Sequence, residues 1–107
     1  MTKAFYAHST NDYNTEFESL AILQIKRLLK DIEIINPKDL PKPEHIKNNQ
    51  LYKLEHEVYF PIINKCDVLI ATRCWNRINK RGKFSEGVLL EINYALAQNK
   101  KVYELGA

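Results

Sequence analysis

Four short apolar runs divide the chain into strand-like segments that alternate with longer segments of helical or irregular character. Runs that are rich in β-branched and aromatic residues, and that are bounded by polar or proline-containing stretches, predict strands. Apolar positions that recur every three or four residues predict helices between them. We therefore expect strands at 3–7, 31–36, 67–71 and 101–105, and helices at 15–30, 49–65 and 85–98.

Local signals indicate where these elements begin and end. Thr15 and Glu18 have the spacing of a capping box, in which a hydroxyl and a carboxylate satisfy the first backbone N–H groups of a helix. Pro37 ends the second strand, and Pro61 predicts a break or kink within the second helix. We expect residues 37–48 to be irregular. The first helix should bury one stripe of side chains, namely Phe17, Ala21, Ile25 and Leu28.

The alternation of strands and helices predicts crossover connections, and hence a parallel sheet. We expect an α/β fold, a three-layer flavodoxin-like sandwich whose four-stranded parallel sheet has the order 2-1-3-4, although other orders fit the same alternation. In this order the topological switch point lies between the first and third strands. Ligands of such sheets bind beyond the carboxyl ends of the strands at that point. The loops there are 8–14 and 72–84.

The second of these loops leads directly into a helix start that carries candidate chemistry. Small residues at Ser85 and Gly87 leave backbone N–H groups open to an anion. Glu91 follows one turn deeper, at the expected edge of the helix's apolar face, where it would be neither freely solvated nor fully buried. An ordinary surface glutamate with Ser85 as N-cap also fits. The expected apolar face consists of Val88, Leu89, Ile92, Ala95 and Leu96.

Composition narrows the class of protein. With 107 residues, 45% hydrophobic and 27% charged, the chain suits one soluble domain, residues 1–107. It has no apolar run long enough to cross a membrane and no signal peptide, so we expect a cytoplasmic protein with reduced cysteines and no membrane partner. The three histidines lack metal-ligand spacing, and phosphate-loop and dinucleotide motifs are missing. We therefore expect no metal and no cofactor.

Positive charge gathers in the connection between the third predicted strand and the last predicted helix, residues 72–84. Between Asp67 and Glu86 there is no acidic residue. Such a positive field suits a phosphorylated small molecule. It suits nucleic acid less specifically, and we do not expect nucleic acid as a partner. The ordinary explanation of such a charge run is a solvated loop. Trp75 and Phe84 could stack on a base or pack the loop down. The basic residues of this connection are Arg73, Arg77, Lys80, Arg81 and Lys83.

A carboxylate at the edge of an apolar face can act as a nucleophile or as a general acid or base. At an anomeric carbon, Glu91 could form a glycosyl-enzyme intermediate, as in retaining glycoside hydrolysis. The start of its helix could hold a 5′-phosphate. Hydrogen bonds from the opposite wall could come from Tyr6, His8 and Ser9.

Segments 66–71, 85–95 and 100–102 together resemble the nucleoside 2-deoxyribosyltransferase superfamily. The resemblance is closest to the 2′-deoxynucleoside 5′-monophosphate N-glycosidase branch, with its aspartate-led apolar strand, S-x-G-V-x-x-E motif and small-residue helix. Segments 5–9 and 34–37 also fit family positions. The match covers most of the chain, and the serine–glycine–glutamate segment is its specific part.

The resemblance implies roles for individual residues. It makes Glu91 the nucleophile at C1′ of a deoxyribose, and it makes Ser85 and Gly87 the holders of the 5′-phosphate. Two family positions differ in this chain. Phe5 stands where the family has a tyrosine, and Tyr59 stands near the position of a helix aspartate that positions the sugar and protonates the leaving base, with Glu55 and Glu57 close by.

The sequence thus predicts an enzyme that cleaves or transfers the N-glycosidic bond of a nucleoside or nucleoside 5′-monophosphate. Two alternatives remain open at this stage. One is a non-catalytic module that binds and senses a nucleotide on the same fold, and the other is a TIR-like domain that cleaves NAD. The resemblance also implies a homo-oligomer, most simply a dimer.

Overall fold

A computed structural model describes residues 1–47, 49–74 and 82–105 of the chain. Its centre is one four-stranded sheet in the order β2-β1-β3-β4, in which every neighbouring pair is parallel. The flavodoxin-like order expected from the sequence is therefore confirmed. The strands are β1 (Thr2–Ala7), β2 (Ile32–Ile35), β3 (Val68–Ala71) and β4 (Lys101–Glu104).

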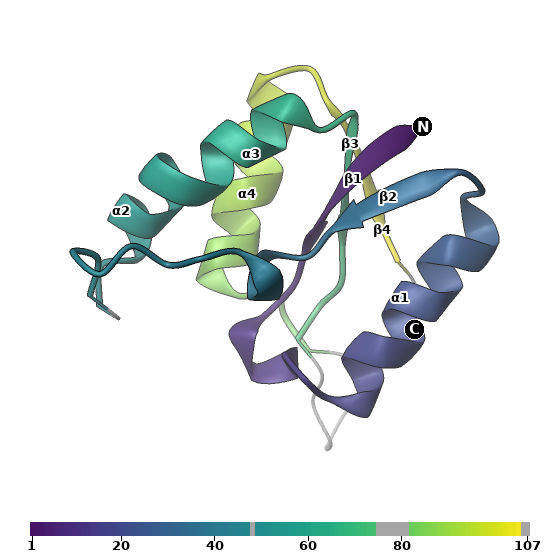
Figure 1. Ribbon diagram of the computed structural model, residues 1–107, viewed down its shortest axis with the longest axis horizontal. Coiled ribbons are helices and arrows are strands. Elements are labelled where there is room, and N and C mark those ends of the chain that lie inside the picture. The colour runs from purple at the N-terminus through teal and green to yellow at the C-terminus, as the bar shows by residue number, and fades with distance from the viewer. Residues whose placement is uncertain (48, 75–81, 106–107) are drawn as a thin grey trace.

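Helices cover both faces of the sheet, which gives three layers. Figure 1 shows α1 on one side of the strands and α2, α3 and α4 on the other. Within the described residues, no helix is both long and apolar enough to pass through a bilayer. The helices are α1 (Glu16–Leu28), α2 (Leu51–Leu54), α3 (Phe60–Lys65) and α4 (Glu86–Ala97), with the short 3₁₀ turns η1 (Thr10–Asp12) and η2 (Pro37–Asp39) and the π-helical segment η3 (Glu55–Tyr59).

The pleat of β1 sends neighbouring side chains into two different cores. Phe5 packs in the core beneath α3 and α4, together with Leu69 and Val88. Tyr6 points to the opposite face, where it packs in the core beneath α1 with Ile25. Both aromatic side chains are fully buried. The two layers therefore receive their aromatic residues from adjacent positions of one central strand.

The ends of the helices and strands agree with the sequence prediction to within two residues, but two predicted faces are wrong. Leu28 ends α1 exposed to solvent, so it is not part of the core stripe. On α4, Leu89 and Leu96 are exposed, and the buried positions are Val88, Glu91 and Ala95. Glu91 consequently lies in the middle of the buried face of its helix and not at the edge.

The predicted interruption near Pro61 takes the form of a π-helical segment. Proline has no N–H group, and its ring clashes with the carbonyl group four residues earlier. The turn that precedes Pro61 is wider than an α-turn, and the N–H of Phe60 donates to the carbonyl of Glu55, five residues back. Helical structure thus continues from Leu51 to Lys65 without a break. The wide turn places Glu55 and Phe60 on the same buried side.

Candidate active site

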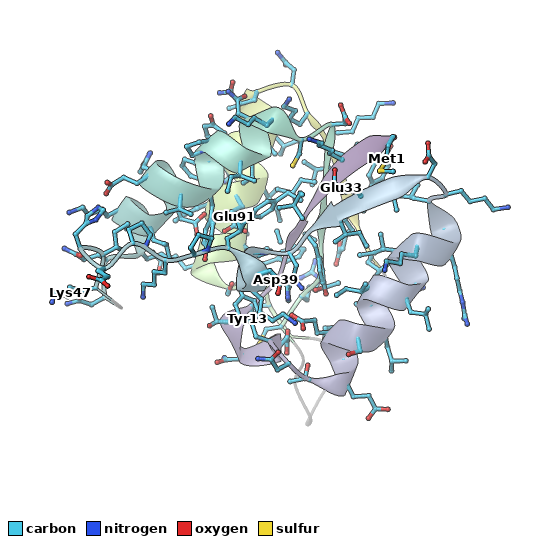
Figure 2. All side chains as sticks on the ribbon, in the orientation of Figure 1. Met1, Tyr13, Glu33, Asp39, Lys47 and Glu91 are labelled. Atoms are coloured by element: carbon cyan, nitrogen blue, oxygen red, sulfur yellow. The ribbon has the colours of Figure 1, made fainter. Side chains whose placement is uncertain are left out.

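A pair of carboxyl groups, Glu55 and Glu91, lies buried where η3 and α4 meet on one face of the sheet. Glu91 comes from α4, whose first turn follows the loop after β3, and Glu55 begins the π-helical segment η3. Their residues are 4% and 1% exposed. The two side chains hydrogen-bond to each other. Figure 2 shows Glu91 and Tyr13 toward the end of the sheet at which β1 finishes.

A hydrogen bond between two carboxyl groups requires that one of them carries a proton. Burial raises the pKa of Glu55 from 4.5 to about 7, although its hydrogen bond with Glu91 acts in the opposite direction. Burial, with the hydrogen bond and the charge of Glu55, raises the pKa of Glu91 well above its ordinary range. Two carboxylates in one low-dielectric space cannot both ionise readily. The pair therefore holds one shared proton near neutral pH, and its titration belongs to the pair.

One oxygen of this pair has no partner within the part of the chain that the structure describes. Glu55 Oε1 is buried and accepts no hydrogen bond there, while the rest of its carboxyl group is engaged with Glu91. Leaving a buried polar atom unsatisfied costs about 1–3 kcal/mol. Native proteins retain such atoms mainly where function requires them. Glu55 Oε1 is therefore a free acceptor at the centre of a buried polar site.

The start of α4 lies directly against this pair. The hydroxyl of Ser85 caps the helix and accepts from the N–H of Val88 at 3.4 Å. Gly87 stands in the first turn, and a Cβ atom built there would lie 3.4 Å from both Glu55 Oε2 and Leu51 Cδ1. The small residue lets the helical run from Leu51 approach α4 closely. The predicted anion-binding helix start and the carboxyl pair thus form one continuous site.

Two tyrosine hydroxyls lie beside the carboxyl pair. Tyr13, after η1, and Tyr59, at the end of η3, hydrogen-bond to each other. Burial raises the pKa of both tyrosine hydroxyls, and the charges of Glu91 and Glu55 raise these pKa values further. Tyr59 also raises the pKa of Tyr13. Both hydroxyls are therefore protonated at neutral pH and able to donate hydrogen bonds. The Tyr59 ring also contacts Phe5, with 6.1 Å between ring centroids.

The other predicted binding residues, Tyr6, His8 and Ser9, form a separate group at the end of β1. The Tyr6 hydroxyl hydrogen-bonds Thr72 Oγ1 at 3.0 Å, and its ring stacks on His8 with 3.9 Å between centroids. His8 Nε2 lies 2.6 Å from Glu18 Oε2. Ser9 is buried and caps η1 through its hydroxyl. The structure thus brings Ser85, Gly87 and Glu91 together and places Tyr6, His8 and Ser9 in a neighbouring cluster, where their binding role stays a prediction.

The base of the basic connection is held against β4. The guanidinium group of Arg73 lies 4.5 Å from the centroid of the Phe84 ring, and its Nε donates to Glu104 Oε1 at 2.6 Å. The N–H of Cys74 donates to the carbonyl of Lys83 at 3.0 Å. Phe84 therefore packs under a cation at the loop base. The predicted roles of Trp75, Arg77, Lys80 and Arg81 lie outside the described residues.

Glu55 is a site residue to which the sequence alone assigns no role. The resemblance places an acid near Tyr59, and Glu55 lies one turn earlier in the same helical run. Two sequence signals favour it: Glu55 is an acid close to Tyr59, and Pro61 predicts an irregular turn nearby. Phe5 remains an apolar wall residue, because its side chain fills the core beneath α3 and α4. In the described part of the chain, no three His, Cys, Asp or Glu side chains are grouped to bind a metal.

Comparison with solved structures gives two close matches to this fold. A conserved protein from Enterococcus faecalis V583 matches with a TM-score of 0.68 and 20% identity, over 97% of this chain and 62% of its own. A 2-desoxiribosyltransferase from Leishmania mexicana matches with a TM-score of 0.63 and 17% identity, over 98% of this chain and 64% of its own. Neither a protein-family model nor a curated protein matches the sequence significantly.

These matches establish the class of fold. The chain has the α/β fold with sheet order 2-1-3-4 that the resemblance implied, and it is similar in fold to the 2-desoxiribosyltransferase from Leishmania mexicana. The chain spans less than two thirds of the length of either matched structure.

Proposed function

We propose that this domain breaks the N-glycosidic bond of a nucleoside or nucleoside 5′-monophosphate and passes the sugar to water or to a second base. The buried carboxyl pair, Glu55 with Glu91, is the observation that carries the proposal. A pair that shares one proton at neutral pH offers a base and an acid at one place, which is what cleavage of a glycosidic bond requires. The fold, shared with a deoxyribosyltransferase, supports the same class of reaction.

In this proposal Glu91 acts as the nucleophile and Glu55 as the proton donor. The Glu91 carboxylate attacks C1′ of the sugar, and the bond between C1′ and the base nitrogen breaks with its electrons leaving on the base. Glu55 gives its proton to the departing base, so a neutral base is released and a glycosyl ester remains on Glu91. Ionised Glu55 then takes a proton from the incoming water or second base as that nucleophile displaces Glu91.

The shared hydrogen bond gives the proton a path between the two roles. In the free protein this bond lowers the pKa of Glu55 and raises that of Glu91, so the proton rests on Glu91 and has to move along the same bond to Glu55 before Glu91 attacks. Positive charge that develops on the sugar next to Glu91 favours an ionised Glu91 and thereby a protonated Glu55. The geometry thus links substrate binding to the placement of the proton.

A 5′-phosphate is proposed to bind at the start of α4. The first backbone N–H groups of a helix and its dipole favour an anion. Ser85 and Gly87 leave this end narrow, and Gly87 lies against the carboxyl pair. One bound molecule can therefore reach both parts of the site, with its phosphate at the helix start and its C1′ near Glu91. Lys83, two residues before Ser85, adds favourable charge, whereas Arg73 is paired with Glu104.

Release of free base from deoxynucleosides and their 5′-monophosphates tests this proposal. We expect Glu91→Gln and Glu55→Gln each to lower the rate at least about a hundredfold, because each removes one of the two required groups. Glu57→Gln is the matched control, since Glu57 is an exposed glutamate of the same helical run and pairs with His45 at 3.1 Å. Mass spectrometry of the trapped sugar ester should locate it on Glu91.

The nucleotide-sensing alternative makes a different prediction in the same assay. A sensor would bind a nucleoside monophosphate saturably without releasing base, and both glutamine variants would still bind. Saturable binding with no release by the wild-type protein would therefore contradict the enzymatic proposal. Nicotinamide release from NAD without base release would instead favour the TIR-like alternative.

A further inference from the structure

Glu18 is the centre of a second buried polar cluster, which meets the carboxyl pair through Tyr13. The residue is only 2% exposed although it comes from the first turn of α1. Its Oε2 lies 2.6 Å from His8 Nε2, and its Oε1 accepts from Lys38 Nζ and from the N–H of Asn14, each at 3.1 Å. Three donors from three different elements therefore converge on one carboxylate.

The hydrogen-bond pattern fixes the charges in this cluster. His8 Nδ1 lies 3.0 Å from the carbonyl oxygen of Tyr6, which can only accept, so Nδ1 carries a hydrogen. Burial acts to raise the pKa of Glu18, but the hydrogen bonds from His8, Lys38 and Asn14 outweigh it and lower the pKa. Glu18 is therefore ionised, and its two oxygens accept hydrogen bonds from all three groups.

The cluster holds Tyr13 from two sides. Asn14, its neighbour in the chain, has a left-handed backbone with φ of 60°, and its N–H is the group that donates to Glu18. The ring of His8 contacts the ring of Tyr13, with 4.9 Å between centroids. Asparagine adopts this left-handed region readily, so the contacts with Glu18 and His8, and not backbone strain, fix the orientation of this turn. The position of Tyr13 therefore depends on Glu18.

Tyr13 connects this cluster to the carboxyl pair. Its hydroxyl bonds to that of Tyr59, and both hydroxyls lie within electrostatic range of Glu55 and Glu91. Two hydroxyls that bond to each other use one of their two hydrogens, which leaves the second for another acceptor. The buried Oε1 of Glu55 is an acceptor that lacks a partner within the described residues.

We propose that Glu18 is a positioning residue of the carboxyl-pair site, which holds Tyr13 so that the hydroxyls of Tyr13 and Tyr59 supply a hydrogen bond to the pair when it loses its proton. This inference deepens the proposed function, on which its consequence for turnover rests. The contacts that carry it do not depend on the reaction. Lys38 is the cation paired with Glu18, His8 hydrogen-bonds the same carboxylate, and Asp12 and Tyr6 are the other titratable groups beside this cluster.

Glu18 could influence the carboxyl pair in two ways, which would shift the pKa of the pair in opposite directions. If Glu18 acted only through its charge, its neutralisation would remove a negative group and make the pair easier to ionise. If Glu18 positions Tyr13, its loss withdraws a hydrogen-bond donor from the ionised pair and makes ionisation harder. The direction of the change therefore separates a positioning role from a simple electrostatic one.

Carbon-13 NMR of the glutamate carboxyl carbons, recorded without substrate while the pH is varied, measures this directly. We expect Glu18→Gln to raise the titration midpoint of the Glu55–Glu91 pair by about one pH unit, and Tyr13→Phe to raise it similarly. The double variant should show no further increase, because both changes remove the same hydrogen bond. Glu57→Gln, an exposed glutamate whose histidine pair resembles that of Glu18, should leave the midpoint unchanged.

Turnover provides the second measurement. With a nucleoside monophosphate as substrate, Glu18→Gln should lower kcat about tenfold with little change in KM, since the donor acts on the reacting carboxylates. Thermal unfolding checks that each variant is folded, and Tyr13→Phe, which removes a single oxygen, serves if Glu18→Gln does not fold. A midpoint that falls or stays constant in folded Glu18→Gln and Tyr13→Phe would overturn the inference. Shifted midpoints in a protein that releases no base would instead contradict only the proposed function.

Discussion

A carboxyl group that is buried beside a second one makes the stability of a protein depend on pH. The pKa of Glu55 is raised by burial to about 7, and that of Glu91 is raised as well, because burial and the neighbouring carboxyl group both disfavour its charge. A group with a raised folded-state pKa contributes stability that is complete below its unfolded pKa and is lost as the pH rises through the folded value. Unfolded glutamate titrates near 4.5.

The raised pKa values of the carboxyl pair should make the wild-type protein less stable as the pH rises. Between about pH 5 and pH 8 we expect the free energy of unfolding of the wild-type protein to fall, because the folded pair resists ionisation that the unfolded chain accepts. Glu55→Gln should reduce this fall, since a neutral amide replaces one member of the pair. Denaturant unfolding at several pH values measures it. An equal pH dependence in wild type and Glu55→Gln would contradict the shared-proton description.

The pKa of Glu18 is shifted in the opposite direction, so Glu18 affects stability over a different pH range. Its lowered pKa means that its stabilising effect is present above the unfolded value and disappears as the pH falls through the folded one. The two polar clusters therefore act at different ends of the titration, Glu18 on the acid side and the carboxyl pair near neutrality.

At the scale of the element, the start of α4 has both a structural and a binding role. Ser85 caps the helix through its hydroxyl, as Thr15 caps α1 by accepting from the N–H of Glu18 at 3.2 Å. The predicted capping box at Thr15 is only half formed. The carboxylate of Glu18 turns away from the cap to His8 and Lys38, because a buried charge binds the strongest donors within reach.

We expect Ser85→Ala and Thr15→Ala each to lower the free energy of unfolding by about 1 kcal/mol, since each removes an N-cap. Only Ser85→Ala should weaken binding of a nucleoside 5′-monophosphate more than binding of the nucleoside, because only its helix start is proposed to hold the phosphate. Calorimetric titration of both ligands measures this. Equal losses for the two ligands in Ser85→Ala would contradict the phosphate site.

The elements show what the sequence allows one to predict. The strands, their order and the ends of the helices follow from apolar runs, prolines and caps, which act locally. The buried faces are harder to assign, because Leu28, Leu89 and Leu96 fit a helical stripe but lie where no neighbouring element covers them. For the same reason, the helical pattern places Glu91 at the edge of the apolar face, whereas its side chain is buried. Burial of a polar residue depends on what packs against it, and this information is not local.

At the scale of the whole molecule, two apolar cores of unequal size hold the sheet between its helical layers. The core beneath α3 and α4 includes Ile63 and Val88, with Tyr59 packed against it, and the smaller core lies beneath α1. Figure 1 shows α3 and α4 packed together over the same face of the strands. The site therefore borders the larger core, and its shape depends on the packing of that layer.

Ile63→Ala and Leu96→Ala form a matched pair that tests this arrangement. Ile63 is 1% exposed, so its truncation should leave a cavity and lower the free energy of unfolding by about 2–5 kcal/mol. Leu96 is 55% exposed, and its truncation should change stability by no more than about 0.5 kcal/mol. Chemical denaturation of both variants gives the comparison. Similar losses in both would show that another molecule covers the outer face of α4.

The π-helical segment before Pro61 has a consequence for comparing this chain with its relatives. A π-turn holds one residue more than an α-turn, so residues before and after it follow two different helical phases. In an ideal α-helix, a shift of one residue rotates a side chain by about 100°. Against a chain whose turn is α-helical here, an alignment drawn through residues 55–59 without a gap pairs positions that face different directions. Glu55 is then matched to an acid of that chain by superposition of structures and not by counting residues back from the third strand.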